Sequence, residues 1–277
     1  MGYEMIVLDL DGTLTNRDKV ITPRTKAALM KAMERGKKVV LASGRPTYGV
    51  MPLARELKLA EYGGYILAYN GGVIMDCQTE ELVFSRMLPV EANHRIIELA
   101  LKNRVDFLTY DGEVILTSNE ENPYAKIESG INHLRLHQLE IDEFFARVDF
   151  AVPKFLFVDD GDYLASVEPK VKAALGKNFS VYRSEPYFLE ILPQGVDKAQ
   201  SLERLLEVTG IKREEMIACG DGYNDLSMIK FAGLGVAMEN GVLPVRKAAD
   251  YITASNNEDG VGLVVEKFML GGEVQEA

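Results

Sequence analysis

The feature that most constrains this chain is a pair of acids directly after an apolar run near the amino terminus. Residues 5–8 are apolar and lead into Asp9-Leu10-Asp11-Gly12-Thr13, a pattern typical of a buried strand that ends in a loop. Open α/β sheets bind ligands at this end of their strands. Asp9 and Asp11 are two residues apart, so we expect both carboxylates on the same side, where they repel by about 4 kcal/mol at ~4 Å and an effective dielectric of ~20. A divalent cation would relieve that repulsion and leave one acid available for nucleophilic attack.

A second segment with suitable chemistry follows the apolar residues 39–42. Ser43-Gly44-Arg45-Pro46 comes next, and Pro46 suits the first turn of a helix that runs toward Leu57. A hydroxyl, a glycine and a helix amino terminus together suit an anion. An ordinary capped helix explains this segment equally well.

Two more segments lie in the carboxyl-terminal third of the chain. Asp197 is expected to cap a helix whose first residue is Lys198. A lysine there opposes the helix dipole and costs about 0.3 kcal/mol, which suggests that its ammonium is needed nearby, although a solvated lysine is the alternative. The apolar residues 216–219 then lead into a second acidic loop, Gly220-Asp221-Gly222-Tyr223-Asn224-Asp225.

The order of expected elements predicts two domains. Strands at 5–8, 39–42 and 65–68 alternate with helices, which is the pattern of a doubly wound parallel sheet. From about residue 84 the pattern changes to helices and hairpins, with a polar stretch at 119–149 that we expect to be loop and helix. The α/β alternation resumes after Pro193. The chain is therefore predicted to be an α/β protein with an inserted α+β domain.

Composition excludes several classes of protein. The 277 residues are 47% hydrophobic and 26% charged, as in ordinary soluble globular proteins, and no apolar run approaches the ~20 residues of a membrane span. The amino terminus lacks the features of a signal peptide, and Cys77 and Cys219 lie far apart, which suggests reduced thiols in a cytoplasm. The net charge of −11 disfavours nucleic acid, anionic membranes and, unless local cations reverse the sign, anionic substrates.

A parallel sheet would bring all four segments to one edge. The carboxylates in these segments would attract a cation, and the hydrogen-bond donors would bind an anion. The carboxylates are Asp9, Asp11, Asp221 and Asp225, and the donors are Ser43, Gly44, Lys198 and Asn224. Ligand sets made only of oxygen favour Mg²⁺, which keeps phosphate oxygens and water in its shell. A carboxylate nucleophile, a magnesium ion and an anion site together indicate phosphoryl transfer.

These segments resemble the four signature motifs of the haloacid dehalogenase superfamily of aspartate-nucleophile phosphohydrolases. The similarity is greatest to the Cof/YidA-type sugar phosphatases with a subfamily IIB cap, and it covers almost the whole chain. The matching motifs are, in order, Asp9-Leu10-Asp11-Gly12-Thr13, Ser43-Gly44-Arg45, Lys198 and Gly220-Asp221-Gly222-Tyr223-Asn224-Asp225. The resemblance implies a Rossmann-like core of residues 1–83 and 186–277, with residues 84–185 inserted as a cap.

The resemblance also implies a role for each motif residue. Asp9 would attack phosphorus to form an aspartyl-phosphate, and Asp11 would protonate the leaving oxygen and then activate water. Asp11 would carry its proton while Asp9 stays ionised, because its side chain would lie off the metal. Mg²⁺ would bind the carboxylates of Asp9 and Asp221 and the backbone carbonyl of Asp11. Further residues would steady this arrangement (Asp225, Gly12 and Thr13) or hold the phosphoryl oxygens (Ser43, Lys198, Asn224 and the amides at Leu10 and Gly44).

The sequence thus predicts a magnesium-dependent phosphatase for small phosphorylated metabolites, with sugar phosphates as the expected substrates and no nucleic-acid or membrane partner. A phosphomannomutase-type phosphosugar mutase and a metabolite-binding relative without turnover remain alternatives. Glu190 could either face the substrate or pair with Lys198. The positions expected to face the substrate are Arg45, Glu120, Arg183, Tyr187 and Glu190.

Overall fold

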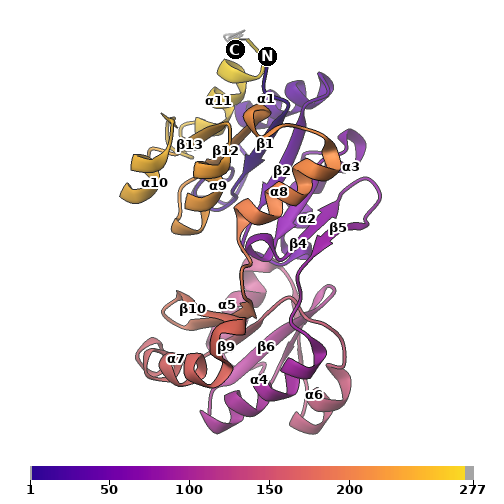
Figure 1. Cartoon of the computed structure of the whole chain (residues 1–277), viewed down its shortest axis with the longest axis vertical. Helices are drawn as coiled ribbons and strands as arrows, with labels where there is room; N and C mark the ends of the chain where they lie inside the picture. Colours follow the sequence, from indigo (N-terminus) through magenta and orange to yellow (C-terminus); the bar gives the residue numbers. More distant parts are fainter. Residues whose placement is uncertain (1, 272–277) are drawn as a thin grey trace. The chain divides into compact units, whose positions relative to one another are not determined.

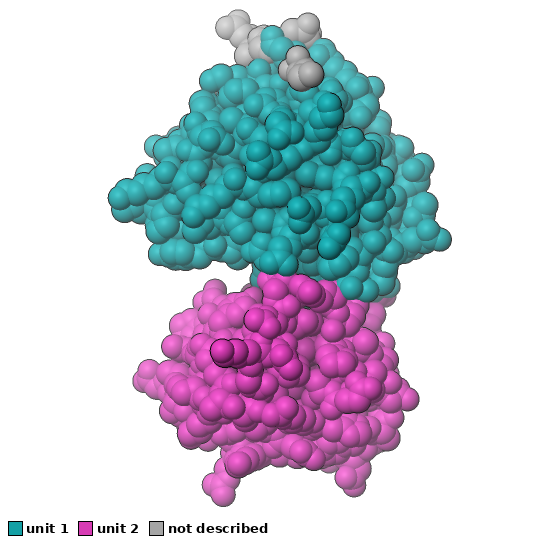
Figure 2. All heavy atoms as spheres, viewed as in Figure 1, with its two compact units in different colours: residues 1–85, 197–277 teal, residues 86–196 magenta. Residues whose placement is uncertain are grey.

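The chain folds into two compact units in a computed structural model that describes residues 2–271 (Figure 1). Unit 1 comprises Met1–Ser85 and Asp197–Ala277, and unit 2 comprises Arg86–Val196 (Figure 2). Residue 1 and residues 272–277 of the expected core lie outside the described part. Within residues 2–271, every helix is too short or too polar to cross a bilayer.

Unit 1 is built on an eight-stranded sheet. Six neighbouring strands run parallel, and the last two are added antiparallel at one edge. In spatial order the strands are β14 (Tyr251–Ile252), β13 (Leu234–Ala237), β12 (Met216–Gly220), β1 (Met5–Leu8), β2 (Lys38–Ala42), β3 (Tyr65–Ala68), β4 (Val73–Asp76) and β5 (Leu82–Ser85). The predicted doubly wound parallel core is confirmed.

Helices cover both faces of this sheet because its central strands are apolar on both sides, as in other parallel sheets. On one face, Met5 and Val7 of β1 pack with Leu202 and Leu205 from a helix that follows unit 2. The other face is covered by helices that contact β2 and β3. The α-helices of unit 1 are α1 (Pro23–Glu34), α2 (Thr47–Glu56), α3 (Leu59–Tyr62), α8 (Lys198–Thr209), α9 (Leu226–Phe231), α10 (Leu243–Ala248) and α11 (Gly260–Phe268), and its 3-10 turns are η1 (Tyr69–Gly71), η3 (Arg213–Glu215) and η4 (Tyr223–Asp225).

Unit 2 is an α+β unit with a six-stranded sheet. Its strand pairs are antiparallel except for the parallel pair at one edge, formed by the last two strands in this order: β10 (Phe179–Glu185), β11 (Phe188–Pro193), β9 (Phe155–Val158), β6 (Asp106–Asp111), β7 (Val114–Thr117) and β8 (Arg135–Gln138). Its helices are α4 (Val90–Lys102), α5 (Pro123–Asn132), α6 (Ile141–Arg147) and α7 (Gly161–Leu175), and the 3-10 turn η2 (Gly176–Asn178) follows α7. The predicted inserted α+β domain therefore has its own sheet.

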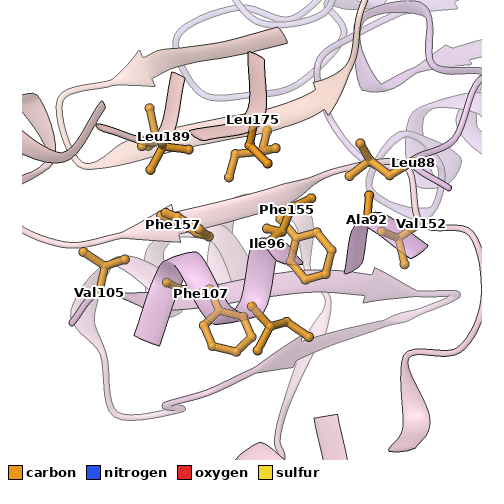
Figure 3. Close-up of a cluster of buried hydrophobic side chains, with 14 of the residues drawn as sticks. Leu88, Ala92, Ile96, Val105, Phe107, Val152, Phe155, Phe157, Leu175 and Leu189 are labelled. Atoms are coloured by element: carbon orange, nitrogen blue, oxygen red, sulfur yellow. The ribbon is translucent and has the colours of Figure 1, made fainter. Parts of the chain in front are cut away.

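A continuous hydrophobic core lies between the sheet of unit 2 and its helices (Figure 3). Phe107 of β6 lies opposite Phe157 of β9 in the strand register, and both rings are buried. Phe107 also packs against Phe144 of α6, with ring centroids 4.8 Å apart. Aromatic pairs of this kind bury large areas and therefore contribute to the stability of the unit.

The structure differs from the sequence expectation in two places. The second boundary between the units lies at residues 196/197 rather than 185/186, because β11 pairs with β10 and β9 and so belongs to the sheet of unit 2. The stretch 119–149, expected to be loop and helix, contains β8 between two helices. β8 is a four-residue edge strand with exposed ends, so it lacks the apolar run that would have revealed it.

Replacing Phe157 by alanine should destabilise unit 2 by about 3–5 kcal/mol, because it leaves a cavity in a closed core. Hydrogen exchange followed by mass spectrometry should show faster exchange in peptides from β6 and β9, with peptides from β1 and β2 unchanged. Leu101→Ala, at a side chain that is 43% exposed, is the matched control and should change stability by less than about 0.5 kcal/mol. Equal acceleration in both units would contradict separate hydrophobic cores.

Candidate active site

The parallel register of unit 1 brings three polar loops to the same edge of the sheet. Leu8, the last residue of β1, lies between Cys219 of β12 and Leu41 of β2. The residues that follow these strands are therefore neighbours, and the Asp9 amide donates to the Cys219 carbonyl at 3.0 Å. Asp9, Ser43 and Asp221 thus come together although they are far apart in sequence.

Lys198 connects the acids of this edge. Its Nζ lies 2.7 Å from Oδ1 of Asp9, 2.6 Å from Oδ1 of Asp225 and 3.0 Å from the carbonyl oxygen of Ala42. The lysine is buried, and these contacts use all three ammonium hydrogens. Asp197 fixes the start of α8 by accepting hydrogen bonds from the next two amides beyond Lys198, as expected for an N-cap.

Asp9, Asp221 and Asp225 form a group whose nearest carboxylate oxygens all lie within 4.8 Å of one another. Oδ2 of Asp225 accepts from the amides of Asp221 and Gly222, at 3.0 and 2.9 Å, so this buried acid also shapes the loop. Three carboxylates and one ammonium leave a formal charge of −2, which a divalent cation would balance. A donor set made only of oxygen fits a hard ion such as Mg²⁺. The Asp11 side chain does not belong to this group.

Gly12 is required by the close approach of the first and fourth loops. Its φ is +90°, and a Cβ at this position would collide with the Asp221 carboxylate. Thr13 donates from Oγ1 to Oδ1 of Asp221 at 2.7 Å, and Asn240 donates to the Gly12 carbonyl at 2.8 Å. Of the three residues expected to steady the site, Thr13 thus holds the Asp221 carboxylate by a hydrogen bond, and Gly12 leaves room for it.

Burial and mutual repulsion perturb these acids. Burial raises the pKa of Asp9 well above its usual range, the charges of Asp225 and Asp221 raise it further, and Lys198 opposes the shift. Burial, helped by Asp225, raises the pKa of Asp221 to about 6. Burial lowers the pKa of Lys198, but the charges and hydrogen bonds of Asp225 and Asp9 outweigh it, so the net shift is upward.

In contrast to Asp9, which lies near other acids, the Asp11 side chain lies between two cations. Arg45 donates from Nε and Nη2 to its two carboxylate oxygens, at 2.8 and 2.6 Å, and Lys19 donates to Oδ1 at 2.6 Å. Burial raises the pKa of Asp11, but Arg45 and Lys19 outweigh it, so the pKa is lowered. The expectation that Asp11 carries the proton while Asp9 stays ionised refers to the site with its metal ion bound, and it stays a prediction.

The expected phosphate-binding residues occupy the loops around Asp9. Ser43 is buried, and its Oγ accepts from the Arg45 amide at 3.1 Å. Asn224 donates to Oδ1 of Asn70 at 3.2 Å, and the Asn70 amide donates to the Ser43 carbonyl at 2.9 Å. Asn70 therefore links the second and fourth loops, a role that the sequence reasoning missed. The sequence pattern that could have indicated this role is the Asn-Gly pair directly after a buried strand. Such pairs favour turns with a left-handed residue, and Asn70 has a φ of +56°. Leu10 and Gly44 lie in the same loops.

Four of the expected substrate-facing residues lie in unit 2, and each contacts neighbours within that unit. Glu190 is buried with Lys154, 3.3 Å from its Nζ, so the alternative that it pairs with Lys198 is wrong. Arg183 forms an ion pair with Glu168 at 3.0 Å, and the ring of Tyr187 stacks on that of Tyr124 with 5.0 Å between centroids. The backbone amide of Glu120 donates to the side chain of Gln138 at 3.0 Å. Arg45 is in unit 1, on Asp11.

Known proteins resemble the chain over nearly its full length. A family model described as haloacid dehalogenase-like hydrolase matches residues 6–265. The "Putative phosphatase YxeH" of Bacillus subtilis is 34% identical over 97% of this chain and 99% of its own. A crystal structure of a haloacid dehalogenase-like hydrolase from Bacteroides thetaiotaomicron has 50% identity and a TM-score of 0.92, covering 96% of this chain and 99% of that one. The HAD subclass IIB sugar phosphatase BT4131 has 25% identity and a TM-score of 0.78, with coverages of 96% and 98%.

Asp221→Asn should raise the melting temperature of the metal-free protein at pH 7.5 by about 2 °C or more, with little effect at pH 4.5. The folded-state pKa of about 6 exceeds the unfolded value of about 3.9, so ionisation of Asp221 destabilises the fold as pH rises through this interval. Thermal melts in a chelator at both pH values measure the difference. Asp18→Asn, at an exposed acid, is the control. An equal gain at both pH values would contradict the assignment.

Proposed function

The chain belongs to the haloacid dehalogenase-like hydrolase family, and from this premise we propose that it is a magnesium-dependent phosphatase of small phosphorylated metabolites, with sugar phosphates as the favoured class. Phosphoric monoester hydrolysis is the activity named for its relatives, and it is the activity of this enzyme. The finer assignments, of the metal, the intermediate and the substrate class, rest on the residues of the site.

The observation that carries the proposal is the buried bridge from Lys198 to Asp9 and Asp225, with Asp221 alongside. Such a group is expensive to bury, because charges lose their hydration inside a protein. Buried acids with perturbed pKa values are concentrated at functional sites. Lys198 holds one oxygen of Asp9, which fixes the orientation of the carboxylate. A fixed carboxylate beside a cation site is the arrangement that in-line attack on phosphorus requires.

The first step of the proposed reaction transfers the phosphoryl group to Asp9. A carboxylate oxygen of Asp9 forms a bond to phosphorus while the bond from phosphorus to the leaving oxygen breaks, and that oxygen takes a proton from Asp11. Because Arg45 and Lys19 lower the pKa of Asp11, the bound substrate must favour protonation of this residue. A phosphate dianion favours that protonation, since its negative charge disfavours a second negative charge on the nearby Asp11 side chain.

The second step returns Asp9 to its starting state. Water gives a proton to Asp11 as its oxygen bonds to phosphorus, and the bond between Asp9 and phosphorus breaks. Lys198, the Ser43 hydroxyl, the Asn224 amide and backbone amides of the first two loops would hold the phosphoryl oxygens. Because all three Lys198 hydrogens are engaged, contact with phosphate requires that Lys198 exchange one of its present acceptors.

Asp9, Asp221 and the backbone carbonyl of Asp11 would hold Mg²⁺, and Asp225 would support them through the loop amides it accepts. When bound, the ion would neutralise excess carboxylate charge and polarise the phosphoryl oxygens. Its charge would also lower the pKa of Asp9, which favours the ionised nucleophile. The raised pKa values of Asp9 and Asp221 support this assignment.

The substrate class rests on two observations. One neighbour is described as a sugar phosphatase. The net charge of −11 repels anions in general, but Lys19, Arg45 and Lys198 place three cations at the edge where Asp9 lies. Glu120, Arg183, Tyr187 and Glu190 remain our proposed determinants of substrate choice.

Asp9→Asn should abolish release of inorganic phosphate from p-nitrophenyl phosphate, with a loss of at least about 10³-fold, because an amide oxygen cannot replace the nucleophile. Asp18→Asn, in the same segment but exposed, should retain wild-type activity. Substantial activity in Asp9→Asn would contradict nucleophilic attack by this residue. A wild type that moves phosphate between hexose hydroxyls and releases little of it would favour the mutase alternative.

Removal of divalent cations should abolish hydrolysis, and Mg²⁺ should restore it. Binding can be followed without turnover, because Mg²⁺ should raise the melting temperature of the wild type and have a much smaller effect on Asp221→Asn. Glu214→Gln, at an exposed acid outside the site, should keep the wild-type response to Mg²⁺. Full activity in a chelator would contradict the metal assignment.

A further inference from the structure

Lys19 lies outside the four motifs, in a turn that several hydrogen bonds hold in one conformation. The Asn16 amide donates to the Val20 carbonyl at 3.0 Å, and the Lys19 amide donates to the Asn16 carbonyl at 3.0 Å. Oδ1 of Asn16 also accepts from the amides of Asp18 and Val20, at 2.9 and 3.2 Å. Lys19 itself has a φ of +61°, a conformation that costs a non-glycine residue about 1–2 kcal/mol.

The turn is also tied to a distant part of unit 1. Asn257 accepts from the Arg17 amide at 3.0 Å, and Asn256 donates to the Thr15 carbonyl at 2.8 Å. These bonds hold both the backbone before the turn and its second residue. The Lys19 side chain therefore starts from a defined position and reaches back to Asp11, where its Nζ lies 2.6 Å from Oδ1.

Stability does not explain this contact. The Lys19 side chain is 61% exposed, and ion pairs of that exposure contribute about 0–1 kcal/mol, so the contact with Asp11 adds little to the stability of the fold. Arg45 already binds both oxygens of Asp11. The second cation on Oδ1 therefore restrains a carboxylate that is charge-paired without it.

We propose that Lys19 is a positioning residue for Asp11. With Arg45 it holds the Asp11 carboxylate away from the Asp9, Asp221 and Asp225 group and at the place where the carboxyl meets the leaving oxygen. This inference rests on the proposed function, in which Asp11 transfers a proton to that oxygen. A positioning role predicts that loss of Lys19 affects proton transfer more than phosphate binding.

The test compares two aryl phosphates that differ in how much they need a proton. Phenoxide is a far more basic leaving group than p-nitrophenoxide, so phenyl phosphate depends more on the acid. Lys19→Gln should lower kcat/KM for phenyl phosphate about 10-fold more than for p-nitrophenyl phosphate, a part of the full general-acid effect because Arg45 remains. Lys19→Arg should restore both values to within about 3-fold of wild type.

Two reference variants make the result specific. Arg17→Gln removes a cation of the same turn that contacts Asp18 and not Asp11, and should leave both substrates unaffected. Asp11→Asn should show the same preference as Lys19→Gln, only larger. Equal losses on both esters in Lys19→Gln, or no loss, would overturn the inference while leaving the phosphatase intact. Equal losses on both esters in Asp11→Asn would overturn the acid role of Asp11, and an absence of hydrolysis by the wild type would overturn the proposed function. Either of these two results would also overturn the inference about Lys19.

Discussion

The bridge from the Lys198 ammonium to Asp9 and Asp225 is the interaction on which the site depends. Lys198 begins a helix that follows unit 2, Asp9 follows the central strand β1, and Asp225 closes a loop that starts at β12. One buried cation thus ties together three separate parts of unit 1. Removal of Lys198 would leave two buried carboxylates without their cation, which costs about 3–5 kcal/mol. Stability and chemistry therefore constrain the same residues.

Much of this arrangement follows from local patterns in the sequence. Apolar runs that end in polar loops identify β1, β2 and β12, and the parallel order of the sheet brings Asp9, Ser43 and Asp221 together. The unfavourable position of Lys198 at a helix start also signalled its role near the acids. These inferences succeed because strand ends in a parallel sheet share an edge regardless of the details of side-chain packing.

Features that depend on distant partners could not be predicted in the same way. The residues of β11 are apolar and clearly a strand, but nothing local shows that this strand pairs with β9 rather than with the sheet of unit 1. The contacts of Asp11 with Lys19 and Arg45 could not be predicted either, because these cations come from separate loops. The roles of Asn70 and Lys19 likewise arise from turns whose significance appears only when the loops meet.

The discontinuity of unit 1 has a consequence for its synthesis. β1 lies between β2 and β12, yet β12 begins at Met216, after all of unit 2. At about 5–20 residues per second, a ribosome exposes one side of β1 for about 10–40 s before its second neighbour emerges. Unit 2, which is continuous in sequence, can fold during that interval. The nascent chain therefore carries an open apolar strand edge beside a finished domain, which is the stage at which chaperone protection matters most.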